Sequence, residues 1–371
     1  MNNRVIIAVT NDLSGDQRVH KVAMSLINFG YQPILVGRAL PDSRPLQRPY
    51  PCRRFRLLFR KGPLFYAEYT IRLFLYLMFS HAGWFLANDL DTLPAVYSAG
   101  RLRKRRIVYD SHEYFTEVPE LVGRDKTKRI WERIERRLFP RLKLVYTVNS
   151  SIAAIYSKKY GVDVKVVRNL PSVTGRVEVA GRLPAGFEGL PYMIYQGALN
   201  IGRGLEELIA AVNLLPDCRL LLAGDGDKKP DLERLVSELG LGDRVRFTGR
   251  MPFEQLAWYT RRAVLGISLE QDLGLNYHFA LPNKLFDYMT AGIPVLASDL
   301  PEIRSVVEEV GFGMVINRFD PGFLSDTIAE ILADSARLKQ WSEAAIAAAP
   351  GYVWEREEEV LREIFADLRA G

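Results

Sequence analysis

One short segment of the sequence combines the start of a helix, a cation and a carboxylate. Pro282 is placed to open a helix, and the three residues after it would present free backbone N–H groups beside a positive side chain: Asn283, Lys284 and Leu285. Such a helix start can hold a diphosphate. One turn further on, Asp287 can accept hydrogen bonds from two ribose hydroxyls, or it can merely complement the helix dipole. The helix alone leaves both readings of Asp287 open.

Further polar and glycine residues follow short apolar runs that have the character of buried strands. Ligands of parallel α/β sheets bind outside the carboxyl ends of the strands, so these positions are the informative ones. They lie at residues 11–16, 88–91, 110–113, 197–204 and 224–226, and from 270 onwards.

A glycine turn precedes the first expected helix. Gly15 and Asp16 stand before it, and Arg18 lies in its first turn. A glycine turn that opens onto a helix N-terminus can hold an anion, here a phosphate of the donor or of the acceptor. Asp16 is alternatively a plain N-cap of that helix.

The elements that must position these residues follow a regular rhythm. Short apolar runs alternate with helical patterns, which predicts parallel sheets built from βαβ units and therefore the α/β class. Strands are expected at residues 5–10, 33–37, 84–87, 106–109, 144–148 and 164–167, and again at 192–196, 219–223, 245–248, 265–269, 294–297 and 314–316.

The rhythm breaks between residues 170 and 191. This interval holds three prolines and four glycines, which is typical of an interdomain linker. A chain of 371 residues also fits two domains better than one core. We therefore expect Rossmann-like domains at 1–170 and 191–350, joined by a linker at 171–190 and facing a central cleft. A C-terminal helix within 351–371 is expected to return to the first domain.

Composition narrows the class of protein. Hydrophobic residues make up 48% and charged residues 25%, the mix of a folded chain. The two cysteines give no disulfide framework, and no Cys/His cluster has the spacing of a zinc site. The apolar run at 5–9 is too short for a signal peptide, and the region 64–87 is interrupted by Glu68, Arg72 and His81. We expect a cytoplasmic protein.

Taken together, the motifs resemble glycosyltransferase family 4, a large retaining group with the GT-B architecture. Residues 281–298, with Leu-Pro-Asn-Lys-Leu-Phe before Asp287, resemble the family's donor-binding helix in one bacterial branch, where a carboxylate holds the nucleotide ribose. The family usually has Glu where this chain has Asp287. Residues 88–95 and 109–113 are similar to the same branch, and the motifs follow the family's order over nearly the whole chain.

The resemblance implies a donor site in the second domain. Residues 196–206 resemble the glycine loop that faces the diphosphate, with Arg203 as its cation; a solvated loop charge is the alternative. The family often has an additional Arg where this chain has Ala198, and Lys284 is expected to replace that charge. Residues 249–251 resemble the segment that contacts the nucleobase. The expected donor-binding set is Gly15, Gly197, Asn200, Arg203, Gly249, Arg250, Met251, Asn283, Lys284, Leu285 and Asp287.

The resemblance also implies catalytic and acceptor residues. Glu270 resembles the first acid of the family's acidic pair, but seventeen residues, not eight, separate it from Asp287. The inserted residues 276–280 make Asn276 and His278 alternative sugar contacts, with a surface histidine as the plain reading of His278. His112 matches a family histidine that reaches the transferred sugar; its alternative is a histidine that stabilises a loop. The expected catalytic set is His112, Arg203, Glu270 and Lys284, and the acceptor-side set is Asp16, Arg18, Asp89, Asp91 and Glu113.

The expected activity is retaining transfer from a nucleotide diphosphate sugar, a UDP-sugar first, to an acceptor hydroxyl on a lipid-linked or surface-polysaccharide precursor. The resemblance implies no metal and no further cofactor, and the pair Asp89 and Asp91 leaves a metal site as the alternative. A nucleotide-sugar epimerase or hydrolase, or a non-catalytic sugar-nucleotide-binding subunit, would fit the same two domains.

The sequence also leaves one surface question open. Basic residues at 53–60 followed by apolar residues at 64–79 suit peripheral contact with an anionic membrane, at the inner face of the cytoplasmic membrane, or else form core. The basic residues lack a nucleic-acid-binding motif, so we expect no nucleic-acid partner.

Overall fold

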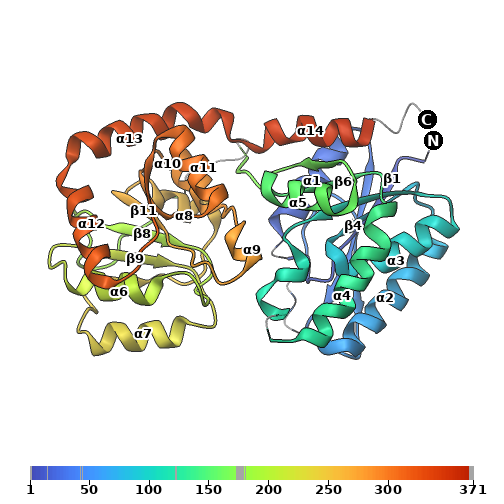
Figure 1. The fold of residues 1–371 in the computed structure, drawn as a ribbon, viewed down its shortest axis with the longest axis horizontal. Helices are drawn as coiled ribbons and strands as arrows, with labels where there is room; N and C mark the ends of the chain where they lie inside the picture. Colours follow the sequence, from blue (N-terminus) through green and yellow to red (C-terminus); the bar gives the residue numbers. More distant parts are fainter. Residues whose placement is uncertain are drawn as a thin grey trace. The chain divides into compact units, whose positions relative to one another are not determined.

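The computed structural model describes residues 2–14, 16–41, 43, 45–121, 123–172, 179 and 181–366. The chain forms two compact units. The first comprises the residues up to Asn169 together with the C-terminal stretch from Glu357, and the second comprises Leu170–Arg356. Each is a sheet with helices around it (Figure 1).

The first unit is built on a parallel sheet with the strand order β3-β2-β1-β4-β5-β6-β7. Its central strands are buried on both faces because helices cover them, and they consist of nearly continuous apolar runs. In the register, Ile7 of β1 lies opposite Leu35 of β2 and Leu86 of β4. The strands are β1 (Arg4–Ala8), β2 (Gln32–Ala39), β3 (Cys52–Arg56), β4 (Trp84–Asn88), β5 (Arg106–Ser111), β6 (Val145–Thr147) and β7 (Val164–Val166).

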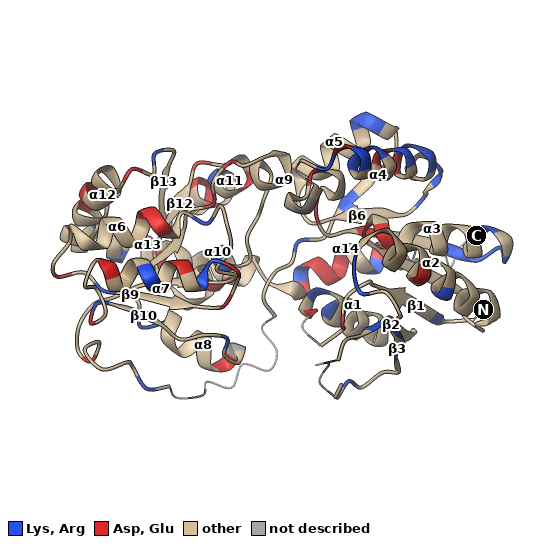
Figure 2. Ribbon diagram, turned by 90° about the horizontal axis from the view of Figure 1, so that it is seen from below, with Lys and Arg blue, Asp and Glu red and all other residues tan. Residues whose placement is uncertain are grey.

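Helices follow most strands of this sheet. α1 buries Val19, Val22 and Leu26 at helical spacing, and Gly30 with a φ of 84° lies just beyond its end. α2, α3 and α4 lie side by side, with α3 in the middle (Figures 1 and 2). The helices are α1 (Gln17–Asn28), α2 (Gly62–Phe79), α3 (Asp89–Leu102), α4 (Asp125–Leu138) and α5 (Ser150–Tyr160), with short 3-10 turns at Phe115–Glu117, Pro119–Leu121 and Phe139–Arg141.

The C-terminal helix α14 (Trp354–Ala366) packs on the first unit from Glu357 onwards. Phe365 packs against Trp84 with 5.2 Å between ring centroids, and Glu358 accepts a hydrogen bond of 2.6 Å from Ser25 Oγ. Arg168 pairs with the buried carboxylate of Glu357 at 2.8 Å. Aromatic and ionic contacts therefore hold residues distant in sequence in one unit.

The second unit repeats the design with a parallel sheet ordered β10-β9-β8-β11-β12-β13. Its strands are β8 (Met193–Gln196), β9 (Leu220–Ala223), β10 (Val245–Phe247), β11 (Leu265–Ser268), β12 (Val295–Ser298) and β13 (Gly313–Ile316). Its helices are α6 (Leu205–Asn213), α7 (Lys229–Glu238), α8 (Phe253–Thr260), α9 (Leu275–His278), α10 (Lys284–Ala291), α11 (Pro301–Val310), α12 (Pro321–Ala333) and α13 (Ser335–Ala348), with a 3-10 turn at Ala349–Gly351.

The expected α/β class and the two Rossmann-like sheets are confirmed, and each expected strand lies within two residues of its observed bounds. The sequence did not predict β3. Only Phe55 of that edge strand is buried, and its other residues are arginines and a cysteine, so no apolar run marks it.

The interval expected to be a linker is partly core. Phe187 is fully buried in the second unit, next to Leu170 and Tyr192, because its ring lies in the same apolar cluster. Residues 173–178 and 180 lie outside the described part of the chain.

Helix α2 settles part of the question about the apolar region after residue 60. Phe65, Tyr69, Leu73 and Leu77 form one buried stripe, so this face is core. The opposite face remains exposed. Among the described helices, none has the length and apolar character needed to cross a bilayer.

Candidate functional site

A buried ion cluster lies at the carboxyl edge of the second unit's sheet. Glu270 follows β11 and is fully buried, and Lys284 is the first residue of α10. Lys284 Nζ lies 2.8 Å from Glu270 Oε1, and Nη1 of Arg203, in the loop before α6, lies 3.4 Å from the same oxygen. Three of the four expected catalytic residues therefore meet, and two cations against one carboxylate leave the cluster one net positive charge.

The Glu270 carboxyl is held in its ionised form. Burial alone raises its pKa, but the ion pair with Lys284, the Ser268 hydroxyl at 2.6 Å and the nearby Arg203 outweigh burial and lower the pKa below its usual value. Arg203 contributes a further donor: its Nε is buried and has no hydrogen-bond partner among the described residues. An orphaned donor beside a net positive cluster fits a phosphate oxygen.

Close backbone approach explains two glycines near this cluster. Gly197 follows β8 with a φ of 135°, which side chains rarely adopt. A Cβ on Gly224 would lie 1.8 Å from the Gly197 carbonyl oxygen, so the loops after β8 and β9 touch through their backbones. Lys284 reaches the same turn, with its Cε 3.6 Å from where a Cβ on Gly197 would lie. Lys284 therefore lies beside the turn that contains Ala198, and its role as the substitute cation stays a prediction.

Asp287 lies on α10 next to the end of β8. Its Oδ2 accepts a hydrogen bond of 2.7 Å from Gln196 Nε2, and the side-chain amide oxygen of Gln196, Oε1, accepts one of 2.8 Å from Thr260 Oγ1. The Tyr288 hydroxyl contacts the carbonyl oxygens of Ile194 and Ile267, which fixes α10 against β8 and β11. The carboxylate of Asp287 is therefore oriented by a relay of side chains that sequence reasoning did not assign.

The start of α10 differs from the sequence expectation in one detail. The Leu285 N–H donates to the Pro282 carbonyl at 3.2 Å, and its side chain is fully buried in the core. The turn formed by Pro282 thus uses up one of the three N–H groups expected to be free. Asn283 is exposed at the N-cap position.

The remaining expected donor residues are spread around this edge. Asn200 Oδ1 accepts from the Asp227 N–H at 3.3 Å, which links two loops. Gly249 has a φ of 69°, and Met251 packs against the second unit's core. Arg250 is 82% exposed, with Nε 3.8 Å from Asp225. These positions describe a loop after β10 and leave its role in binding a prediction.

The inserted residues before α10 form the short helix α9. His278 Nδ1 lies 2.8 Å from Asp272 Oδ2, and the Arg203 guanidinium lies 5.6 Å from the Tyr277 ring centroid. The insertion therefore packs over the cation of the glycine loop.

In the first unit, Asp16 caps helix α1. Its Oδ1 accepts a hydrogen bond of 3.0 Å from the Val19 N–H, and its Oδ2 accepts one of 2.6 Å from Asn11 Nδ2. The plain N-cap reading of Asp16 is thus what the geometry shows. Gly15 lies outside the described residues.

Arg18 is engaged in a buried ion pair. It is 5% exposed, donates to both oxygens of the fully buried Asp110 at 2.8 and 3.1 Å, and donates to the Val167 carbonyl at 2.8 Å. Burial raises the pKa of the Asp110 carboxyl, but Arg18 and His112 outweigh it and lower the pKa. Arg18 was expected to hold an anionic ligand, and the anion that it holds here is Asp110.

His112 lies at the centre of a polar network after β5. Its Nε2 is 3.1 Å from Asp110 Oδ2 and 3.1 Å from Asn88 Oδ1, its Nδ1 is 3.6 Å from Asp89 Oδ2, and its backbone N–H donates to Asp89 Oδ1 at 2.8 Å. Asp89 has a φ of 59°, an uncommon backbone conformation for a residue other than glycine. The structure thus brings the expected residues His112 and Asp89 together.

The charges of this network are interdependent. Burial lowers the pKa of His112, but Asp110 and Asp89 outweigh burial and raise it to about 9. Burial raises the pKa of Asp89 to about 7 and that of Asp91 to about 6. Near neutral pH the imidazole is therefore a cation between two carboxyl groups.

Asp91 and Glu113 complete the expected acceptor-side set. Asp91 is 7% exposed; its Oδ2 accepts 2.6 Å from Thr10 Oγ1, while its Oδ1 is buried without a hydrogen-bond partner in the described structure. Asp89 and Asp91 thus contact different partners. Glu113 follows His112 and is half-buried, and its carbonyl accepts from Ser111 Oγ at 2.8 Å. No group of three or more metal-ligating side chains occurs among the described residues.

Sequence reasoning placed Asn88, Asp110 and Gln196 in informative segments but gave them no individual role, and it did not single out three further members of these networks: Thr10, Thr260 and Ser268. Asn88, Asp110 and Gln196 each stand at the last residues of a strand, so position at a carboxyl end was the available signal. Their partners were not readable, because the chain distances that separate them are long. Asp110, for example, lies 92 residues from Arg18.

The sequence of the second unit is similar to sequences of known glycosyltransferases. Residues 184–348 match the family model of glycosyl transferases group 1. Alpha-D-kanosaminyltransferase of Streptomyces kanamyceticus is 28% identical over 166 residues, which are 43% of this chain and 41% of that protein. The chain thus spans less than half the length of this curated relative.

Solved structures are similar over the whole chain. Sucrose-phosphate synthase of Thermosynechococcus elongatus has a TM-score of 0.80 at 19% identity and covers 99% of both chains. Anabaena HepE, solved in complex with UDP and glucose, has a TM-score of 0.77 at 18% identity, covering 98% of this chain and 100% of HepE. Residues 184–348 are thus similar to glycosyl transferases group 1, and the chain has the GT-B fold.

Proposed function

We propose that this protein is a retaining glycosyltransferase that moves a sugar from a nucleotide diphosphate sugar to an acceptor hydroxyl. The observation that carries the proposal is the buried cluster of Arg203, Glu270 and Lys284, with the Arg203 Nε left without a partner among the described residues. The cluster offers a diphosphate a net positive charge and the N–H donor of Arg203 that lacks a partner among the described residues.

The donor is a UDP-sugar in this proposal. The structurally similar HepE was solved with UDP and glucose, which favours uridine over other bases. The α and β phosphates would face Arg203 and Lys284 beside Gly197, and Asp287 would accept from the ribose hydroxyls. Asp287 is suited to this because Gln196 already fixes its orientation.

The chemistry follows from where charge develops. When the bond between the sugar C1 and the diphosphate oxygen breaks, negative charge builds on that oxygen. Arg203 and Lys284 are already in place to stabilise it, so no reorganisation is needed at that moment. The acceptor oxygen then bonds to C1 on the same face, and its proton passes to the leaving phosphate oxygen. Configuration at C1 is retained without a separate protein nucleophile.

The acceptor belongs to the first unit in this proposal. His112, with a pKa raised to about 9, would donate a hydrogen bond to the transferred sugar, and Asp89 would orient the imidazole. A hydroxyl of the acceptor would supply the donor that the buried Asp91 Oδ1 lacks in the described structure. A lipid-linked or surface-polysaccharide precursor is the proposed acceptor class.

Calorimetric titration with UDP, GDP, ADP and their sugars tests the donor site. We expect uridine nucleotides to bind, and Arg203→Ala and Asp287→Ala to weaken binding by about 1.5–3 kcal/mol each, as loss of a charged hydrogen bond does. Lys339→Ala is the matched control, because this exposed cation lies on α13 away from the cluster. If no nucleotide binds, or both variants bind as the wild type does, the donor site is wrong.

A second measurement separates transfer from the alternatives. NMR of the UDP-sugar with enzyme and no acceptor should show an intact donor with only slow hydrolysis. Rapid epimerisation or hydrolysis without acceptor would favour the epimerase or hydrolase reading. Tight binding without turnover over a panel of acceptors would favour the non-catalytic subunit.

A further inference from the structure

Helix α4 presents a continuous basic face to solvent. Exposed cations recur every three or four residues along its four turns, and none forms an ion pair within the described part of the chain. The opposite side of the helix is anchored by the buried Trp131 and Glu135. The face consists of Lys126, Arg129, Arg133, Arg136 and Arg137, with Ile130 55% exposed among them.

Helix α2 presents an apolar face to solvent, and one ion pair crosses it, between Glu68 and Arg72 at 2.9 Å. Leu64, Ile71, Leu75 and Phe79 lie on one side of this helix, opposite its buried stripe, and Phe79 is 81% exposed. A single exposed leucine needs no explanation, but four exposed apolar side chains on one side of one helix do. Leu58, also 81% exposed, precedes the helix.

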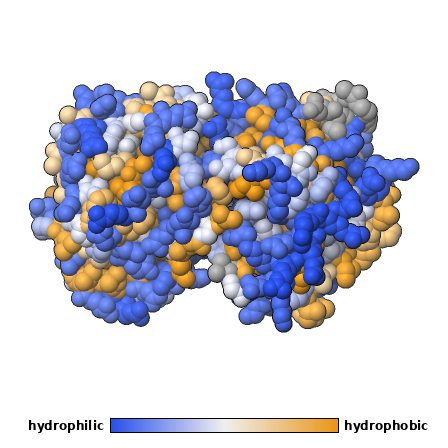
Figure 3. Space-filling model, viewed as in Figure 1, coloured by the Kyte–Doolittle hydropathy of each residue, from blue (hydrophilic) through white to orange (hydrophobic). Residues whose placement is uncertain are grey.

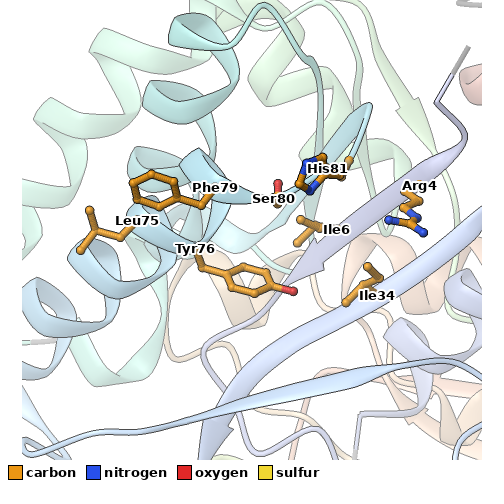
Figure 4. Close-up of a pocket in the computed structure, with 9 residues that line it drawn as sticks. Arg4, Ile6, Ile34, Leu75, Tyr76, Phe79, Ser80 and His81 are labelled. Carbon is orange, nitrogen blue, oxygen red and sulfur yellow. The ribbon is translucent and has the colours of Figure 1, made fainter.

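The apolar face continues into a hollow of about 520 Å³ at the end of α2. Leu75 and Phe79 belong to the exposed row and also line this hollow, together with Ile6 and Ile34 of the sheet (Figure 4). Arg4, at the start of β1, stands at its edge. The hollow therefore lies away from the carboxyl ends of the strands and is separate from the networks around His112.

The basic and apolar faces belong to neighbouring helices. The Tyr66 ring of α2 lies 5.1 Å from the Trp131 ring of α4, and both helices also pack on α3 (Figures 1 and 2). In both helices these aromatic contacts are on the inner side, and the basic and apolar faces are on the outer side. Figure 3 shows the strongly hydrophilic surface over α4.

We infer that the outer faces of α2 and α4 form a docking surface for an anionic lipid bilayer. Anionic headgroups would pair with the cations of α4, while the apolar row of α2 enters the boundary between headgroups and acyl chains. Charge favours this occupant: the first unit holds 32 Lys and Arg against 19 Asp and Glu. A protein partner would have to match both faces, and nucleic acid would leave the aliphatic row of α2 without a contact. This inference goes beyond sugar transfer and does not depend on it.

Co-sedimentation of the full chain with vesicles tests the surface, with neither donor nor acceptor present. We expect binding to vesicles of phosphatidylcholine with about a third phosphatidylglycerol, and little binding to phosphatidylcholine alone. The variant Arg129→Gln/Arg133→Gln/Arg137→Gln should lose affinity on the order of a hundredfold, about fivefold for each cation near the surface. The control Arg234→Gln/Arg318→Gln/Lys339→Gln, on exposed cations of the second unit, should bind as the wild type does.

A second variant tests the apolar face. Ile71→Ser/Phe79→Ser alters only exposed side chains, so the fold should persist, and binding to anionic vesicles should fall at least tenfold. Raising the salt to 0.5 M should strongly weaken vesicle binding by the wild type. The residual binding of this apolar variant should be almost completely lost at the same salt concentration.

Three outcomes would overturn the inference. One is equal binding to neutral and anionic vesicles, and another is unchanged binding of the triple arginine variant. The third is binding of duplex DNA, lost in that variant, by a protein that does not bind vesicles. Because nucleotide binding is measured separately, failure here leaves the proposed transferase intact.

Discussion

The two units share one architecture and differ in charge at two levels. The first has 32 Lys and Arg against 19 Asp and Glu, a net charge of +13, while the second has 18 against 25, a net charge of −7 (Figure 2). At the carboxyl ends of the strands the charges are distributed the other way round: the basic unit gathers carboxylates there, and the acidic unit gathers cations. There the first unit gathers Asp89, Asp91 and Asp110 around His112 and Arg18, and the second gathers Arg203 and Lys284 around Glu270.

The difference shows that net charge and site charge have separate causes. Net charge comes from exposed helix faces such as that of α4, which bear on association with other molecules. Site charge comes from a few side chains after buried strands, where the low dielectric strengthens each interaction. The basic unit can therefore hold a carboxylate-rich network, and the acidic unit can hold a cationic one.

The largest expected effects come from breaking the buried ion pair in each unit. Arg18→Met and Lys284→Met should each lower the free energy of unfolding by about 3–5 kcal/mol, because each leaves a fully buried carboxylate without its main cation. After these changes Asp110 keeps His112, and Glu270 keeps Arg203 and Ser268. Arg18→Met should cost more, because it also removes the hydrogen bond to the Val167 carbonyl. Urea denaturation measures both.

Double variants test the cause of that loss. Lys284→Met/Glu270→Gln and Arg18→Met/Asp110→Asn remove the stranded charge and should recover part of the stability. If neither double variant is more stable than its single variant, the loss came from packing and the electrostatic comparison fails.

The units should also respond oppositely to pH. The folded-state pKa of His112, about 9, lies above its ordinary 6.5, so its contribution is full below pH 6.5 and is lost as the pH rises through 9. The Glu270 pKa is lowered from 4.5, so its contribution is present above that pH and lost on acidification.

Unfolding free energies of the wild type and His112→Gln at pH 5.5, 7.5 and 9.5 test the predicted loss of the His112 contribution at high pH. The advantage of the wild type should shrink as the pH rises. An advantage that stays constant or grows towards pH 9.5 would show that His112 is not held as a cation in the folded state.

A smaller effect is expected from removing one hydroxyl in each unit. Thr10→Val deprives the Asp91 carboxyl of a 2.6 Å hydrogen bond, and Thr260→Val deprives the Gln196 amide oxygen of one at 2.8 Å. Thermal or urea unfolding should show a loss of about 1–3 kcal/mol for each, larger for Thr10 because a carboxylate accepts its bond. Thr10→Val should also raise the pKa of Asp91 above its value of about 6, which carboxyl NMR can follow.

The smallest effect is expected from two matching helix caps. Asp16 caps α1 and Asp320 caps α12 through hydrogen bonds of 3.0 Å, so Asp16→Ala and Asp320→Ala should each cost about 1 kcal/mol. Calorimetry of UDP-sugar binding to the two variants distinguishes a helix cap from a ligand contact. A cap alone leaves binding unchanged in both variants, whereas a loss confined to Asp16→Ala would assign that residue to a ligand after all.

Some of the site could be predicted because its signals are local. Asp287 on an early turn of a helix, Arg203 in a glycine loop and Glu270 after an apolar run are all visible within a few residues of sequence. The same locality misled for Leu285, whose N–H turned out to be used by the Pro282 turn. Arg18 likewise has the local signature of an anion contact, and only its neighbour across the sheet shows which anion it holds.

By itself, the sequence determined the alternation of strands and helices along the chain. Apolar runs of strand length alternate with helices and define two parallel sheets. They also define the strand ends, where polar residues collect. That information is local, because burial on both faces requires a continuous apolar run. Tertiary structure alone decided which polar residues meet, as when Arg18 reaches Asp110 and Gln196 reaches Asp287. It also decided which face of α2 is core. The reason is physical: parallel pairing brings together strand ends that are tens of residues apart, and pairing between their side chains leaves no periodic trace in the sequence.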